Sequence, residues 1–252
     1  MAGSDGAQYE ISSVISRSFA TITSNLPVFA GLSLILAGIP GFLLEFWQLN
    51  KVTVDAAPGA LFNTANIATL LTGVLVSIVT GAVLQAALTR ATVLHLSGEK
   101  PGFGQCLMVG LTMILPIIGL GLIIGFGVGF AMLLLIVPGI ILWLCWSVAV
   151  PAYVQEKIGV FDSLGRSMEL TSGARWRIFL TMLLVFLGLW LISMPLGLIT
   201  VALGSTGSSV LLALFSAAIS ALSNMVVVAV QSCIYVEPVS YTHLTLPTKR
   251  IV

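Results

Sequence analysis

The chain has 252 residues and a net charge of +1, with 58% hydrophobic and only 8% charged residues. Soluble domains carry about 25% charged residues, and no water-soluble core has room for an apolar excess this large. The composition therefore places the chain among the polytopic helical membrane proteins. Because the net charge is close to zero, no electrostatic argument favours nucleic acid, and we expect no such partner.

Residues 1–25 come before the first long apolar run and have an amphipathic pattern. A helix over residues 9–24 would carry four large apolar side chains on one face: Ile11, Val14, Ile15 and Phe19. Such a two-sided helix favours a position along a membrane surface. We therefore interpret residues 1–25 as a cytoplasmic amphipathic segment.

The apolar runs that follow predict six membrane spans between residues 26 and 237. A span needs about 20 apolar residues, because an α-helix rises about 1.5 Å per residue. The runs are Leu26–Leu44, Ile67–Thr89, Cys106–Val154, Ile178–Leu198 and Val210–Val236. The third run is too long for one span, so we place a turn within residues 126–139. Pro138 and Gly139 would then open the fourth span.

Lysine and arginine are distributed unequally between the two sides that six spans define. One side holds Lys51 alone. The other side holds the N-terminus and the second and fourth connections, with Arg17, Arg90, Lys100, Lys157, Arg166, Arg175 and Arg177. Basic residues concentrate on the cytoplasmic side of membrane proteins. We therefore expect both termini to be cytoplasmic.

Residues 154–179 form a polar stretch between the fourth and fifth predicted spans. A helix over residues 160–172 would place on one face Val160, Phe161, Leu164 and Met168. Its opposite face would hold Asp162, Ser163, Arg166, Ser167 and Glu169. This segment is too short to span, so we expect an interfacial helix on the cytoplasmic surface that ends at Gly173. A weak ion pair between Asp162 and Arg166 is expected from their i, i+4 spacing.

The same stretch supplies the candidate lipid headgroup residues. Arg175, Trp176 and Arg177 directly precede the fifth span, where arginine and tryptophan typically anchor a helix at headgroup level. Together with Arg166 they could hold anionic headgroups, with each basic residue contributing about 1 kcal/mol. The positive-inside bias alone would also produce this cluster.

Three polar residues lie inside the predicted spans: Gln85, Asn224 and Gln231. Hydrogen bonds between helices are the favoured interpretation, and a path for a neutral substrate is the alternative. Charged residues, which usually mark ion paths, are missing from the predicted span interiors, because Glu45 and Glu237 fall at the ends. Glycines at 121, 125 and 129 form two GxxxG steps, for which we favour packing within the chain over contacts between chains.

Several short motifs resemble a known family. PGI (138–140), Pro151, EKIG (156–159), SLGRS (163–167) and LTSG (170–173) have spacings similar to those of two related groups. These groups are the membrane domain found beside glycerophosphoryl diester phosphodiesterases and the YciC-type inner-membrane proteins. The resemblance covers most of residues 8–237 and implies a bacterial polytopic inner-membrane protein. The phosphodiesterase activity of that family belongs to a separate barrel of about 250 residues, for which this chain has no room.

The last residues differ from the rest of the chain. SYTHLTLPT (240–248) resembles the translation of a common sequencing adapter. We therefore interpret residues 238–252 as a non-native tail and leave them out of the reasoning about the fold.

The sequence offers no pattern for catalysis or for a cofactor. It contains no GxSxG, HExxH or P-loop motif. The three cysteines, Cys106, Cys145 and Cys233, lie in or beside apolar runs and are expected to be buried thiols. The carboxylates at 99, 156, 162 and 169 favour a solvated helix face with local ion pairs over acid–base chemistry. We expect no enzyme activity, no cofactor and no metal.

Together these observations predict an all-α polytopic membrane protein of about six transmembrane helices in the bacterial inner membrane. Its expected role is non-enzymatic: membrane organisation, lipid interaction or service as a partner subunit. Membrane lipids, a second copy or another membrane protein would be its partners. A permease-like transporter of a neutral or lipid-like substrate is the alternative. A water-accessible cavity reaching Asn224 or Gln85 would favour transport, and a closed bundle with a basic rim would favour the lipid-surface role.

Overall fold

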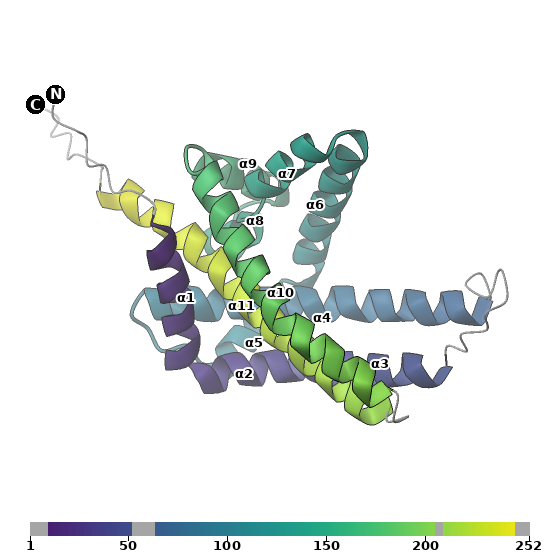
Figure 1. Cartoon of the computed structure of the whole chain (residues 1–252). Helices are drawn as coiled ribbons and strands as arrows, with labels where there is room; N and C mark the ends of the chain where they lie inside the picture. Colours follow the sequence, from purple (N-terminus) through teal and green to yellow (C-terminus); the bar gives the residue numbers. More distant parts are fainter. Residues whose placement is uncertain (1–9, 52–63, 205–208, 245–252) are drawn as a thin grey trace, which may run out of the picture.

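The computed structural model describes residues 10–51, 64–204 and 209–244, which are helical and contain no strand. The helices are α1 (Ile11–Ser24), α2 (Leu26–Ser33), the π-helical η1 (Leu34–Gly38), α3 (Ile39–Lys51), α4 (Thr64–Leu96), α5 (Phe103–Thr112), α6 (Ile114–Leu134), α7 (Ile136–Cys145), α8 (Ala149–Glu156), α9 (Val160–Thr171), α10 (Arg175–Gly204) and α11 (Ser209–Leu244). Figure 1 shows α3 beside α4, the pair α10 and α11, and the hairpin of α6 and α7.

Six segments are long and apolar enough to cross a membrane, which confirms the predicted class. They are Leu26–Gln48, Ile67–Leu96, Ile114–Leu134, Ile136–Glu156, Arg175–Ile199 and Val210–Glu237. The turn predicted within 126–139 lies at Leu135, which has extended backbone between α6 and α7. Pro138 lies in the first turn of α7, where its missing N–H has no helical partner to lose.

The third span begins later than predicted because residues 103–112 form a helix of their own. α5 ends at Thr112, and Met113 has non-helical backbone before α6 begins. Pro116 explains this break, since a proline cannot bond to the carbonyl four residues before it and its ring collides with that carbonyl. α5 therefore precedes the third span, just as α1 and α9 precede the first and the fifth.

The fourth segment consists of two short helices, α7 and α8, separated at residues 146–148. Pro151 accounts for this break in the same way, because it cannot bond to the carbonyl of Ser147. Backbone groups freed inside an apolar region must find other partners. The Ser147 hydroxyl donates to the carbonyl oxygen of Leu144 at 2.8 Å, and the Ser167 hydroxyl of α9 donates to that of Cys145 at 2.7 Å. α9 is thus bonded to the break itself.

The surface helices α1 and α9 pack on the bundle mainly through small hydroxyl side chains, which corrects the predicted faces. The buried residues are Val14, Ser18, Thr21 and Ile22 of α1, and Ser163, Leu164, Ser167, Leu170 and Thr171 of α9. Phe19, Phe161 and Met168, predicted to lie on the apolar faces, are 50%, 75% and 39% exposed. Small hydroxyl residues let helices approach closely and bond to backbone carbonyls. The large apolar side chains are left on the outer surface, where a membrane-surface helix would meet lipid.

Backbone turns with positive φ connect α8, α9 and α10. Lys157 follows α8 with φ 51°, and Gly173 follows α9 with φ 82°, which confirms the predicted end of that helix. Lys157 is the one described non-glycine residue in this conformation, which L-residues rarely adopt. These two turns set the direction in which α9 crosses the ends of α8 and α10.

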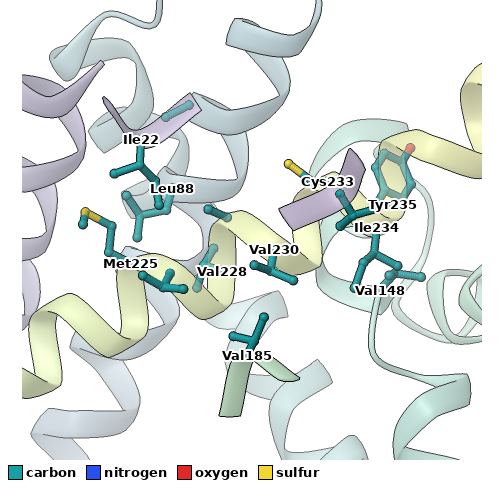
Figure 2. Close-up of a cluster of buried hydrophobic side chains, with 14 of the residues drawn as sticks. Ile22, Leu88, Val148, Val185, Met225, Val228, Val230, Cys233, Ile234 and Tyr235 are labelled. Atoms are coloured by element: carbon teal, nitrogen blue, oxygen red, sulfur yellow. The ribbon is translucent and has the colours of Figure 1, made fainter. Parts of the chain in front are cut away.

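α11 lies at the centre of the larger hydrophobic core. Figure 2 shows Met225, Val228, Val230 and Ile234 along this helix, with Ile22 and Leu88 near one end of the cluster and Val148 beside Ile234. A second, smaller core joins α4, α6, α8 and α9. α11 continues to Leu244, into the predicted non-native tail, and residues 245–252 of that tail lie outside the described residues.

Substitution by alanine should destabilise the protein at two glycines that lie where two helices pack closely together. A Cβ added at Gly110 would lie 2.6 Å from the carbonyl oxygen of Val83, and one at Gly139 would lie 2.8 Å from the backbone of Met132. Overpacking of this kind costs about 1–3 kcal/mol, so Gly110→Ala and Gly139→Ala should lower the melting temperature in detergent by several degrees. Gly125→Ala is the control, because no atom lies within 4 Å of its Cβ position. Equal melting temperatures for all three variants would contradict these crossings.

Candidate lipid-binding site

Arg175 and Trp176 line a cavity between α7 and the start of α10. The cavity has a volume of about 360 Å³, and its other walls are Val137, Ile140, Ile141, Leu144 and Phe179. Val137 lies at the beginning of the fourth apolar segment and Arg175 at the beginning of the fifth. In a plain antiparallel bundle these two residues would stand at opposite ends. Their meeting in one cavity shows that α7 lies alongside the first turns of α10.

The cavity is apolar along its length and carries a single charged residue. Trp176 is 83% exposed, and its indole meets the ring of Phe179 edge-on, with the centroids 5.9 Å apart. Tryptophan commonly takes such positions where an apolar environment meets a polar one. The guanidinium of Arg175 can give two parallel hydrogen bonds to a phosphate. This arrangement suits an amphiphile with an anionic head.

Arg166, which was also predicted to hold lipid headgroups, forms ion pairs with two carboxylates of this protein. Its Nε donates to both carboxylate oxygens of Glu156 at 3.1 Å, and its Nη1 donates to Glu169 at 3.3 Å. The hydrogen bond that Arg166 donates to Glu156 is the main cause that raises the pKa of Arg166. The predicted pairing with Asp162 is wrong, because the turn at Lys157 brings Glu156 to the guanidinium instead. Arg177 does not line the cavity.

Glu156 is the centre of a polar network that joins four helices. The Tyr235 hydroxyl of α11 donates to the carboxylate at 2.9 Å, and Arg166 reaches it from α9. The neighbouring Gln155 accepts a hydrogen bond from Arg90 of α4 at 3.1 Å. The sequence predicted local ion pairs here, but it did not predict that these groups bond to residues of other helices. The network holds α9, and with it the start of α10, in place.

The intramembrane polar residues do not join helices as expected. The amide of Asn224 donates to the carbonyl oxygen of Ser220 on its own helix at 2.8 Å, so the predicted interhelical bond is wrong for this residue. Asn224 also lines an open groove of about 700 Å³ between α10 and α11, whose walls are mainly leucine and aromatic side chains. Gln85 and Gln231 are half-buried.

The glycine ridge of α6 has no partner among the described residues. No atom lies within 4 Å of the Cβ positions of Gly121, Gly125 and Gly129. The predicted packing of these glycines within the chain is therefore wrong. Leu122, Phe126 and Phe130 beside the ridge are exposed, so this face of α6 presents an apolar surface outward.

The remaining candidate residues show packing rather than reactive surroundings. Cys106, Cys145 and Cys233 are buried free thiols. His95, at the end of α4, lies 2.9 Å from the Asn25 amide through its Nδ1. Among the described residues, no group of three or more His, Cys, Asp or Glu side chains could hold a metal ion.

Comparisons with known proteins find no match among protein-family models, curated proteins or solved structures. The resemblance to the membrane domain beside glycerophosphoryl diester phosphodiesterases therefore stays a prediction.

Double-mutant cycles should separate the observed partner of Arg166 from the predicted one. Combining Glu156→Gln with Arg166→Met should give a coupling energy of about 1 kcal/mol, as expected for a partly exposed ion pair. The matched cycle of Asp162→Asn with Arg166→Met should give a coupling near zero. Both are measured by unfolding the protein in mixed micelles of neutral detergent and dodecyl sulfate. A larger coupling in the Asp162 cycle would contradict the network.

Proposed function

We propose that this protein binds an anionic phospholipid at the start of α10, and that its role is non-enzymatic. The observation that carries the proposal is the apolar cavity with Arg175 and Trp176 in its wall. The cavity would take part of an acyl chain, and Arg175 would meet the phosphate. Membrane organisation, or service as a subunit beside another membrane protein, is the cellular role that such binding supports.

The location we propose is the bacterial inner membrane, with both termini in the cytoplasm. The excess of basic residues in the N-terminal segment and in the second and fourth connections, over the single Lys51 in the other connections, supports this orientation. α1 packs against α11 near its C-terminal end, with Ser13 donating to Glu237 at 3.1 Å. This contact brings the two ends of the described chain together, as an even number of spans requires (Figure 1).

Lipid preference in native mass spectrometry tests the proposal. In neutral detergent, the wild type should bind phosphatidylglycerol more tightly than phosphatidylcholine. Arg175→Gln should weaken phosphatidylglycerol binding about fivefold, since one basic residue contributes about 1 kcal/mol to an anionic lipid. Arg177→Gln is the matched control, because it removes the same charge two residues away without altering the cavity wall. Equal losses in the two variants would indicate a general charge effect and contradict the site.

A permease-like role for a neutral or lipid-like substrate is the second candidate. The groove between α10 and α11 favours it, because this groove reaches Asn224 within the sixth span. The groove is walled mainly by exposed apolar side chains, which suits a lipid-like substrate better than a polar one.

Dithionite quenching of a fluorescent lipid separates the two candidates. Proteoliposomes carry a nitrobenzoxadiazole-labelled phosphatidylcholine in both leaflets. A permease for lipid should expose the inner leaflet to dithionite, and Asn224→Leu should slow this exposure while Ser193→Ala, in the same groove, should not. Quenching of the outer leaflet alone in wild-type vesicles would contradict lipid transport and leave the binding role.

A further inference from the structure

A second cleft, of about 540 Å³, opens between α3, α4 and α11. Its α11 wall includes Ser216 and Ser220, which lie about five and about four helical turns before Tyr235 of the Glu156 network. Among the described residues that line the cleft, Glu45 is the only charged one. The site is therefore distinct from the cavity at Arg175, and its charge is of the opposite sign.

Glu45 lies in the last turn of the first apolar segment, three residues before its end at Gln48, as predicted. The predicted span ended at Leu44, but the apolar segment extends to Gln48 and the helix to Lys51. A carboxylate that stands beside apolar side chains is costly to leave without a partner. The ion pairs found among described side chains are those of Arg166, so none of these places a cation on Glu45.

The surroundings of Glu45 add hydrogen-bonding groups. Gln48, Ser77, Ser216 and Ser220 also line the cleft. The Gln48 amide lies across Gly73, where an added Cβ would come within 2.7 Å of its nitrogen. One carboxylate flanked by hydroxyls and an amide provides a single negative charge, which matches a monovalent organic cation.

The remaining wall of the cleft is apolar and opens outward. Leu70, Val74 and Ile78 of α4 line the cleft and are exposed at the surface of the molecule. A ligand that fills the cleft would therefore place a cationic group at Glu45 and an alkyl portion along α4.

We propose that this cleft binds an amphiphile that carries an ammonium group. The carboxylate of Glu45 receives the ammonium, and Leu70, Val74 and Ile78 hold the alkyl chain. Two sources share this chemistry: a bilayer lipid with an ammonium headgroup, and a free cationic amphiphile. The proposal does not depend on the lipid site at Arg175, because the two sites share no residue.

The test measures binding to the full chain in neutral maltoside micelles by native mass spectrometry. The lipid arm compares phosphatidylethanolamine with diacylglycerol, and the soluble arm compares decyltrimethylammonium with decanol. Glu45→Gln keeps the side-chain shape and should weaken the ammonium-bearing ligands about tenfold, as loss of a poorly solvated ion pair requires. It should leave diacylglycerol and decanol unchanged. Glu99→Gln, an exposed carboxylate after α4, is the matched control.

A second variant keeps the carboxylate of Glu45 and fills part of the cleft. Gly41→Leu adds a side chain to the cleft wall, and its Cβ position has ordinary contacts, the nearest at 3.8 Å to Ala217. This variant should weaken the binding of the same ammonium-bearing ligands. Weaker binding of both phosphatidylethanolamine and decyltrimethylammonium supports recognition of an ammonium group from either source. Weaker binding of one of them alone identifies that source. Unchanged affinity in Glu45→Gln, or an equal loss in Glu99→Gln, would overturn the proposal. Either result would leave the Arg175 site untouched.

Discussion

The hydrogen bond from the Ser167 hydroxyl to the carbonyl oxygen of Cys145 determines where the polar part of this molecule lies. The fourth apolar segment breaks before Pro151, and the freed carbonyl would be costly in an apolar environment. Ser167 satisfies it from a helix that is not part of that segment. α9 is thereby held against the break between α7 and α8. Its position also determines where the residues before and after α9 lie. Arg166 is brought to Glu156, and α10 begins beside α7.

Buried hydroxyl groups also occur in the other surface helix, where they bond to the backbone of that helix itself. Ser18 of α1 is buried and donates to the carbonyl oxygen of Val14 at 2.7 Å, and Thr21 is buried beside it. The sequences RSFATITS (17–24) and RSMELTS (166–172) both place a buried serine before an exposed large apolar residue, Phe19 or Met168. Two helices that precede apolar hairpins therefore both turn small hydroxyl side chains toward the protein. Their outward apolar residues are left for the surrounding lipid rather than for the protein core.

The sequence predicted the number of spans and the turn at Leu135, because both depend on the length of apolar runs. It did not predict the break at residues 146–148, although Pro151 cannot bond to the carbonyl of Ser147 four residues before it. The partner of Arg166 could not be predicted in the same way, since it depends on the left-handed turn at Lys157. The faces of α1 and α9 were assigned by hydrophobicity, which fails where the outer environment is as apolar as the core.

Charge is scarce in this chain, with 8% of residues charged, so the position of each charge carries information. Glu156, Arg166 and Glu169 neutralise one another across α8 and α9, and Tyr235 adds a further donor. These groups need nothing from outside the protein. Arg175 and Glu45 differ, because each lines an otherwise uncharged cleft walled partly by exposed apolar side chains. An isolated charge beside apolar surface is stabilised most by a ligand with the opposite charge and an alkyl chain. An amphiphile of opposite charge would therefore complement each cleft, and it is the binding of such an amphiphile at each that we propose.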